Sequence, residues 1–169
     1  MLKEVPFPVA IDSRYPEQVS ICIARDPQGK YNPMTMGWMM PTSYKPPMLA
    51  ISVGKTRYTC EAIRHSREFV IAFPSEVQAD HAKLFGTKSG RTVDKLAMSG
   101  AAVEPARLID GRLMSDAVAN FECKLVNEIE SGDHIIFVGE VLCSHITDRP
   151  TDRLYTLVKS MHMGGLRQK

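Results

Sequence analysis

The sequence predicts a mainly β protein, a closed or nearly closed antiparallel barrel with short helices. Strand-like segments outnumber helical ones along the 169 residues. The clearest of them, residues 117–125, alternates apolar and polar side chains and runs through a turn into a second strand-like segment, which is typical of an antiparallel hairpin. The pattern argues against a Rossmann domain, because no Gly-x-Gly-x-x-Gly motif follows a strand and no β–α–β rhythm is sustained.

The first half of the chain contains three predicted strands. Residues 19–24 alternate and end at the turn signal of residues 26–29. Residues 31–40 form the next predicted strand. Residues 48–53 follow as a third, apolar enough to be buried on both faces.

A short helix is predicted at residues 59–67, because Cys60 and Ile63 share one side while charged residues lie elsewhere. Residues 69–73 form a further strand, which Pro74 ends. From residue 76 to residue 98 the sequence predicts helical pieces separated by residues 85–90. We interpret this stretch as an insertion between strands rather than a separate domain.

The predicted hairpin has one apolar face on each strand. In its first strand the odd-numbered residues 117–125 share the apolar face, which predicts a half-buried strand. A turn at residues 131–133 leads into the second strand, residues 134–143. Its apolar or small face consists of Ile135, Phe137, Gly139, Val141 and Cys143.

The bulk composition is that of an ordinary globular domain, and we expect a single domain over residues 1–169. The net charge of +2 comes from scattered basic residues, so nucleic acid is not an expected partner. No apolar run approaches the ~20 residues of a membrane span, and the N-terminus lacks the apolar core of a signal peptide. These features favour a cytoplasmic protein with no membrane partner.

The cysteines, histidines and methionines do not follow a metal-binding pattern along the chain. The four cysteines are widely spaced without a Cys-x-x-Cys pair, and the five histidines lack ligand spacing. The ten methionines are better explained as core filling than as ligands of copper or haem. The sequence therefore predicts reduced thiols and no metal site.

Two neighbouring segments have the residue types that a flavin mononucleotide needs. Residues 32–43 combine strand-like hydrophobicity with small and polar residues against which a flat ring could lie. Residues 52–59 carry Lys55 and Arg57 with three Ser/Thr residues just before the predicted helix. Since a helix start presents unpaired N–H groups and a partial positive charge, this turn is a candidate phosphate site.

The sequence motifs of this chain, and their order along it, resemble those of the flavin reductase-like family. The resemblance runs roughly from residue 19 to residue 141, and its motifs are Asn32…Met34-Thr35-x-Gly37-Trp38-x-x-Pro41-x-Ser43-x-x-Pro46-Pro47, Arg57-x-Thr59, Ser66-x-x-Phe69-Val70, Ser89-Gly90…Asp94-Lys95, Phe121-Glu122-Cys123 and Gly132-Asp133-His134. It implies FMN, with FAD as an alternative, bound on a Greek-key-like antiparallel split β-barrel in a homodimer.

The resemblance also implies which residues contact the cofactor. The predicted flavin-binding residues are Asn32, Thr35, Met36, Gly37, Trp38, Pro41, Thr42, Ser43, Ser52, Val53, Lys55, Arg57, Thr59, Ser89 and Lys95. His134 is the predicted catalytic residue, on the nicotinamide side of the ring.

Each of these assignments has a purely structural alternative. Trp38 is then a core aromatic residue, and Lys55 and Arg57 are solvated surface cations. Thr59 is an ordinary helix N-cap, and His134 is a turn residue bonded to Asp133. A C-terminal stretch, residues 161–166, either returns to the flavin or the partner subunit or is a flexible end.

The resemblance implies an oxidoreductase that transfers a hydride from NAD(P)H to flavin and passes electrons to an acceptor such as a partner monooxygenase. A rival hypothesis is a flavoredoxin-like electron carrier that holds FMN and reacts poorly with NAD(P)H. A third is an FMN-binding protein that acts on an unrelated small molecule. The sequence does not name the acceptor.

Overall fold

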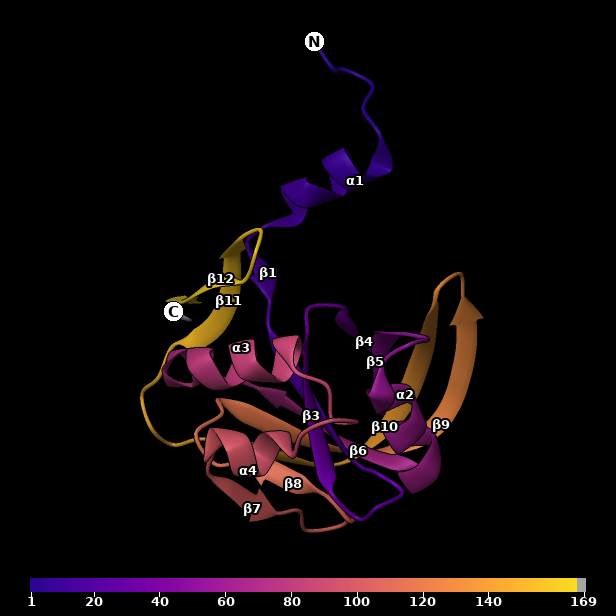
Figure 1. Cartoon of the computed structure of the whole chain (residues 1–169), viewed down its shortest axis with the longest axis vertical. Coiled ribbons are helices and arrows are strands. Elements are labelled where there is room, and N and C mark those ends of the chain that lie inside the picture. The colour runs from indigo at the N-terminus through magenta and orange to yellow at the C-terminus, as the bar shows by residue number, and fades with distance from the viewer. Residues whose placement is uncertain (167–169) are drawn as a thin grey trace.

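The computed structural model describes residues 1–166, and it confirms a mainly β fold built from antiparallel ladders. A seven-stranded sheet has the order β3-β2-β6-β9-β10-β5-β4, next to a three-stranded sheet β1-β11-β12 and a two-stranded sheet β7-β8 (Figure 1). The strands are β1 Glu17–Gln18, β2 Ser20–Arg25, β3 Tyr31–Met36, β4 Met39–Tyr44, β5 Pro47–Gly54, β6 Glu68–Phe73, β7 Val103–Pro105, β8 Arg112–Met114, β9 Ala119–Ser131, β10 His134–Ile146, β11 Arg153–Val158 and β12 His162–Leu166.

The helices are short and lie outside the large sheet. They are α1 Phe7–Ala10, η1 Ile11–Arg14, α2 Tyr58–Ser66, η2 Glu76–Gln78, α3 Ala79–Thr87 and α4 Lys95–Ser99. The N-terminal segment that contains α1 extends away from the rest of the molecule (Figure 1). None of the described helices is long and apolar enough to cross a membrane.

The strand predicted at residues 31–40 is in fact two strands, and this is the largest correction to the predicted element order. The chain breaks at Gly37 and Trp38, so that β3 pairs with β2 while β4 pairs with β5. Gly37 lies against Glu17, since a Cβ at this position would be 2.6 Å from the Glu17 carboxyl carbon. The two strands are consecutive in sequence but form opposite edges of the same sheet, which must therefore curl.

The helix predicted at residues 59–67 begins slightly earlier. Arg57 is the N-cap residue of α2, with extended backbone and no side-chain cap, and Thr59 lies within the first turn. Thr59 is therefore not the cap residue. The helix is one-sided as predicted, because Cys60 and Ile63 are buried against the core while Glu61 and Arg64 are exposed.

The predicted hairpin is confirmed as β9 and β10, which are longer than the sequence pattern indicates. Its apolar face enters the main core through Cys123, Leu125 and Phe137. The opposite face of β9 was predicted to be exposed, but Asn120 and Glu122 are buried. They are covered because the segment around β7 and β8 packs over them, and its backbone hydrogen-bonds to both side chains.

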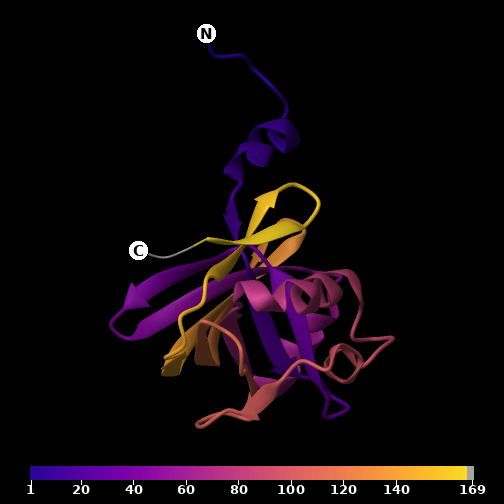
Figure 2. The same cartoon turned by 90° about the vertical axis from the view of Figure 1, so that its left-hand side faces the viewer.

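Several elements have no counterpart in the sequence prediction: α1, η1, β1, β7, β8, β11 and β12. The predicted insertion at residues 76–98 is built of η2, α3 and α4, and α3 packs on β3. Residues 161–166 include β12, which pairs with β11 in the small sheet. The β4–β5 hairpin, in purple, extends from the body of the molecule in Figure 2. Single-domain organisation and cytoplasmic location stay predictions.

Candidate functional site

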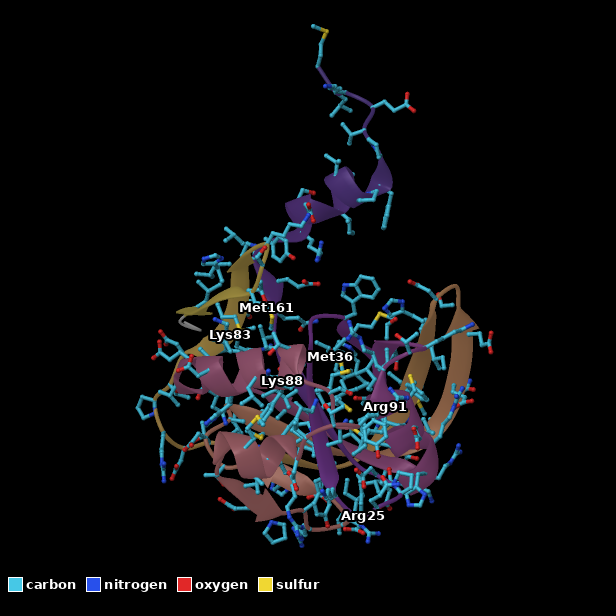
Figure 3. All side chains as sticks on the ribbon, in the orientation of Figure 1. Arg25, Met36, Lys83, Lys88, Arg91 and Met161 are labelled. Atoms are coloured by element: carbon cyan, nitrogen blue, oxygen red, sulfur yellow. The ribbon has the colours of Figure 1, made fainter. Side chains whose placement is uncertain are left out.

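A cleft of about 180 Å³ lies where β3, the start of α2 and the segment after α3 meet. Its walls come from Asn32, Met34 and Thr35 of β3, from residues 56–59, and from residues 85–91 together with Lys95. A groove of about 290 Å³ shares Met34, Thr35 and Arg57 with this cleft and continues past Trp38 to His134. We call the pair the joined groove. Lys88 and Arg91 from the cleft and Met36 from its continuation are labelled in Figure 3.

The α2 end of the joined groove is suited to an anion. The helix begins without a side-chain cap, so its first backbone N–H groups are available to a ligand. Arg57 and Lys88 line the cleft, and neither has an acidic partner among residues 1–166. Arg91 is held in place instead, because it donates to the Thr56 carbonyl at 3.0 Å and lies 3.7 Å from the Glu61 carboxylate.

Asn32 carries a buried polar atom that protein groups leave unsatisfied. The side chain is 4% exposed, and its Nδ2 donates to Thr59 Oγ1 at 3.1 Å. Its Oδ1 has no hydrogen-bond partner in the described structure. Gly90 permits the close approach of the loop, since a Cβ there would lie 2.1 Å from that oxygen. Because an unpaired buried acceptor is costly, Asn32 Oδ1 is a candidate ligand contact.

Lys95 places a second polar group at the bottom of the same cleft. It is 4% exposed and donates through Nζ to the Phe85 carbonyl at 3.1 Å. Burial, and to a lesser extent the charge of Arg57, lowers the pKa of Lys95 to about 8. A bound anion would favour the charged form of this side chain, so the position suits a phosphate or another acceptor-rich ligand.

The far end of the joined groove is open and aromatic. Trp38 is 46% exposed, so it is not a core residue, and its ring lies 4.8 Å from the His134 ring between centroids. His134 Nδ1 lies 2.7 Å from Asp133 Oδ1, and this hydrogen bond lowers the pKa of the Asp133 carboxyl. A flat ring can therefore lie along β3 and β5 beside two aromatic side chains.

The structure brings most of the predicted flavin contacts together. The joined groove is lined by Asn32, Thr35, Met36, Gly37, Trp38, Ser52, Val53, Arg57, Thr59, Ser89, Lys95 and the predicted catalytic residue His134.

The remaining predicted contacts lie outside the joined groove. Lys55 points to the β9 strand and pairs with Glu130 at 2.9 Å on the surface. Pro41, Thr42 and Ser43 belong to β4, on the edge of the sheet, where Pro41 and Thr42 are exposed. Of the two cations beside the helix start, only Arg57 lines the joined groove, because Glu130 binds Lys55 outside it.

Arg14 and Glu17 also line the groove, although sequence reasoning did not select them. They form an ion pair at 3.0 Å near Gly37. No local motif could identify them, because β1 reaches this position by pairing with β11. Arg91 also lines the cleft, and it directly follows the Ser89-Gly90 pair that the sequence analysis did select. Its positive charge next to that pair could have identified it as a candidate site residue.

The comparison with known families agrees with this site. Residues 13–161 match the flavin reductase like domain, and the chain belongs to that family. It spans 66%, 50% and 63% of the length of three archaeal relatives that it matches, so it corresponds to only part of those proteins.

Individual relatives include an uncharacterised archaeal protein and a protein named for flavin chemistry. An uncharacterised protein of Archaeoglobus fulgidus is 37% identical over 119 residues, which cover 70% of this chain and 66% of that protein. A flavin reductase of Pseudomonas putida is 29% identical over 134 residues, covering 78% and 74% of the two chains.

Solved structures share the fold. A flavoredoxin from Methanosarcina acetivorans superposes with a TM-score of 0.87 at 23% identity, covering 100% of this chain and 93% of the other. An FMN-binding protein from Thermus thermophilus, solved with p-hydroxybenzaldehyde, gives a TM-score of 0.85 at 23% identity, covering 100% and 96%. These likenesses show a flavin reductase-like split barrel.

The buried charge of Lys95 generates a prediction on stability. Its pKa in the folded protein, about 8, lies below the value of 10.5 for a free lysine. At pH values between these two numbers, Lys95 therefore carries a proton in the unfolded chain that it has lost in the folded protein. Stability of the ligand-free protein therefore rises with pH across this window, and Lys95→Met removes that rise. Near neutral pH, we expect the free energy of unfolding of Lys95→Met to exceed that of wild type by on the order of 1–3 kcal/mol. This difference should shrink by about pH 10. Urea unfolding at a series of pH values checks this, and parallel curves for the two proteins would contradict it.

Proposed function

We propose that the joined groove binds FMN, with the phosphate at the start of α2 and the ring beside Trp38 and His134. The observation that carries this proposal is the uncapped helix start, whose N–H groups suit a phosphate, next to the buried, unpartnered acceptor Asn32 Oδ1, which suits a hydroxyl donor of the ribityl chain. Arg57, which has no acidic partner among the described residues, supplies a matching positive charge. The relatives named for flavin or FMN support the same ligand.

The phosphate end of the groove favours FMN over the longer FAD. Arg91 lies across this end, where it contacts the Thr56 carbonyl and Glu61 and covers the Tyr58 ring at 5.1 Å. We expect a monophosphate to end beside this side chain, whereas the longer FAD would compete with Arg91 for the same space.

We propose that the activity is hydride transfer from NAD(P)H to flavin, followed by electron transfer to an acceptor. Bound flavin supplies the redox chemistry, since its ring accepts the hydride. The chain contributes geometry: β3 and β5 hold the ring, while Trp38 and His134 flank the open side where a nicotinamide can approach. The rival is a flavoredoxin-like carrier with little NAD(P)H activity, which the fold alone supports equally. Partner monooxygenases remain candidate acceptors.

The phosphate assignment predicts different effects for the two cations that precede α2. Arg57→Ala removes a charged partner of the phosphate, so FMN affinity should fall roughly ten- to a hundredfold, equivalent to about 1.5–3 kcal/mol. Lys55→Ala is the matched control, because Lys55 pairs with Glu130 outside the groove and its loss should leave FMN affinity unchanged. Riboflavin, which has no phosphate, should bind wild type and Arg57→Ala almost equally. Fluorescence titration measures all of these affinities.

Either of two outcomes would contradict the assignment. One is a loss of riboflavin affinity in Arg57→Ala as large as the loss for FMN. The other is an effect of Lys55→Ala on FMN equal to that of Arg57→Ala.

His134 generates the prediction on catalysis. The wild-type protein with bound FMN should be bleached by NADH or NADPH in stopped-flow mixing, which separates a reductase from a carrier. His134→Ala should keep FMN affinity, and should lower the limiting rate or raise the half-saturating NAD(P)H concentration about tenfold or more. His65→Ala, on the exposed side of α2, serves as the control with no expected effect. If His134→Ala loses FMN while its reduction rate is unchanged, His134 is a structural turn residue.

We further propose a homodimer that covers the protruding β4–β5 hairpin. Met40 is 56% exposed and Tyr44 is 91% exposed, and an apolar groove of about 230 Å³ runs beside Met40, Ala50 and Ile136. Sedimentation should give a dimer at micromolar concentration, and Met40→Glu should convert it to a monomer. Val77→Glu changes an equally apolar residue that is 71% exposed on η2, and it should stay dimeric. A monomeric wild type with FMN bound would count decisively against this proposal.

A further inference from the structure

Glu122, Cys143 and His145 come together on the β9–β10 hairpin, away from the joined groove. Cys143 lies directly opposite Glu122 in the ladder, and His145 follows two residues later on the same face of β10. One possible ligand atom from each of the three residues lies within 4.8 Å of the others. None of the three lines the cleft or its continuation past Trp38. The cluster therefore has no role in the proposed flavin chemistry.

The carboxylate of Glu122 is fixed in position before any ligand arrives. It is fully buried, and it accepts hydrogen bonds from the backbone N–H groups of Arg107 at 2.8 Å and Leu108 at 2.6 Å. Burial opposes its ionisation, but these two bonds and the one to His145 outweigh it and hold the pKa of the carboxyl below its usual range. Metal-ligating carboxylates are oriented by such outer hydrogen bonds.

The imidazole already points at the carboxylate. His145 Nε2 lies 2.7 Å from Glu122 Oε1, so a proton lies between the two atoms. A divalent cation takes the place of this proton when the two atoms separate by about 0.6–0.8 Å, since zinc binds nitrogen and oxygen at roughly 2.0–2.2 Å each in a tetrahedral site. The His145 side chain is 33% exposed, so it is not enclosed by protein and can shift toward the solvent by that distance.

Cys143 supplies the third ligand type and the path of entry. It is partly exposed, whereas Cys22, Cys60 and Cys123 are buried in the core. A thiolate, an imidazole and a carboxylate are the ligand set that zinc accepts, with water in the fourth position. The reason that sequence spacing gave no sign of this set is that Glu122 and Cys143 belong to different strands.

We propose that Glu122, Cys143 and His145 form a binding site for a divalent cation of the zinc class. A cation that binds His145 Nε2 displaces the proton from that nitrogen to Nδ1 of the ring or to solvent, and it releases the proton of the Cys143 thiol. The solvent side of the hairpin leaves the fourth position open to water. The proposal is independent of the flavin-binding proposal, because its residues and its ligand are separate.

Cobalt(II) is the probe for the test, because a cobalt–thiolate bond gives a charge-transfer band in the near ultraviolet. The 169-residue chain, without an affinity tag and reduced beforehand, should bind one equivalent of Co²⁺ with this band, and Zn²⁺ should displace it. Cys143→Ser should lose the band and bind Zn²⁺ at least tenfold more weakly. His145→Ala should also weaken Zn²⁺ binding at least tenfold. His65→Ala, an exposed histidine on α2, is the control that should keep both properties.

Thiol labelling provides a measurement that needs no variant. One thiol per chain should react rapidly with a disulfide reagent, because only Cys143 is partly exposed, and Zn²⁺ should slow that reaction more than tenfold. The proposal is overturned if Zn²⁺ leaves the labelling rate unchanged. A cobalt spectrum without the thiolate band, or a band that persists in folded Cys143→Ser, overturns it as well.

Discussion

The structure depends on the placement of β3 and β4 at opposite edges of one sheet. These strands are separated by two residues, so the sheet must curl until its edges meet at Gly37 and Trp38. The meeting point exists because Gly37 has no side chain and the Glu17 carboxylate occupies the space where one would be. The joined groove follows from this geometry. The end that we propose for the flavin ring lies between β3 and β5 near the break, and the end that we propose for the phosphate lies where β3 reaches the start of α2.

Sequence reasoning recovered the parts of the fold whose signals are local. The alternation along β9 and the turn before His134 predicted the hairpin, and the apolar run of β5 predicted a buried strand. It failed where the pattern continues across a break: residues 31–40 remain strand-like through Gly37, so nothing local divides β3 from β4. Within the site, the two cations before α2 have equivalent sequence contexts. Glu130, from the far end of β9, decides that Lys55 faces away and Arg57 does not.

Two kinds of buried polar group distinguish the scaffold from the site. Asn120 and Glu122 hydrogen-bond to backbone groups of the covering segment, with His145 as a further partner of Glu122, and they fasten that segment to the sheet. Asn32 leaves an acceptor unpaired, and Lys95 keeps a charge in a place that lowers its pKa. A buried group without a partner costs about 1–3 kcal/mol, which a ligand with matching groups can recover. Unpaired buried atoms also occur in Ser20, His81 and Arg153, outside the joined groove. The β3–α2 corner differs from them because its unpaired acceptor shares a cleft with Lys95 and the uncapped helix start.

Segments from both ends of the described chain border the joined groove. Arg14 and Glu17 line it from one side, and the Met161 side chain lies within 2.7 Å of the position that a Cβ on Gly86 would take. β1 and β12 flank β11 in the same small sheet, so residues 17–18 and 162–166 run close to each other, whereas the N-terminal segment that contains α1 extends away from them (Figure 1). Circular permutation is therefore open to this fold: a linker that includes the extended N-terminal segment can lead from β12 to β1, and the exposed turn at residues 131–133 can be cut. Such a permutant would have its free ends at the tip of the β9–β10 hairpin, beside His134 at the far end of the joined groove.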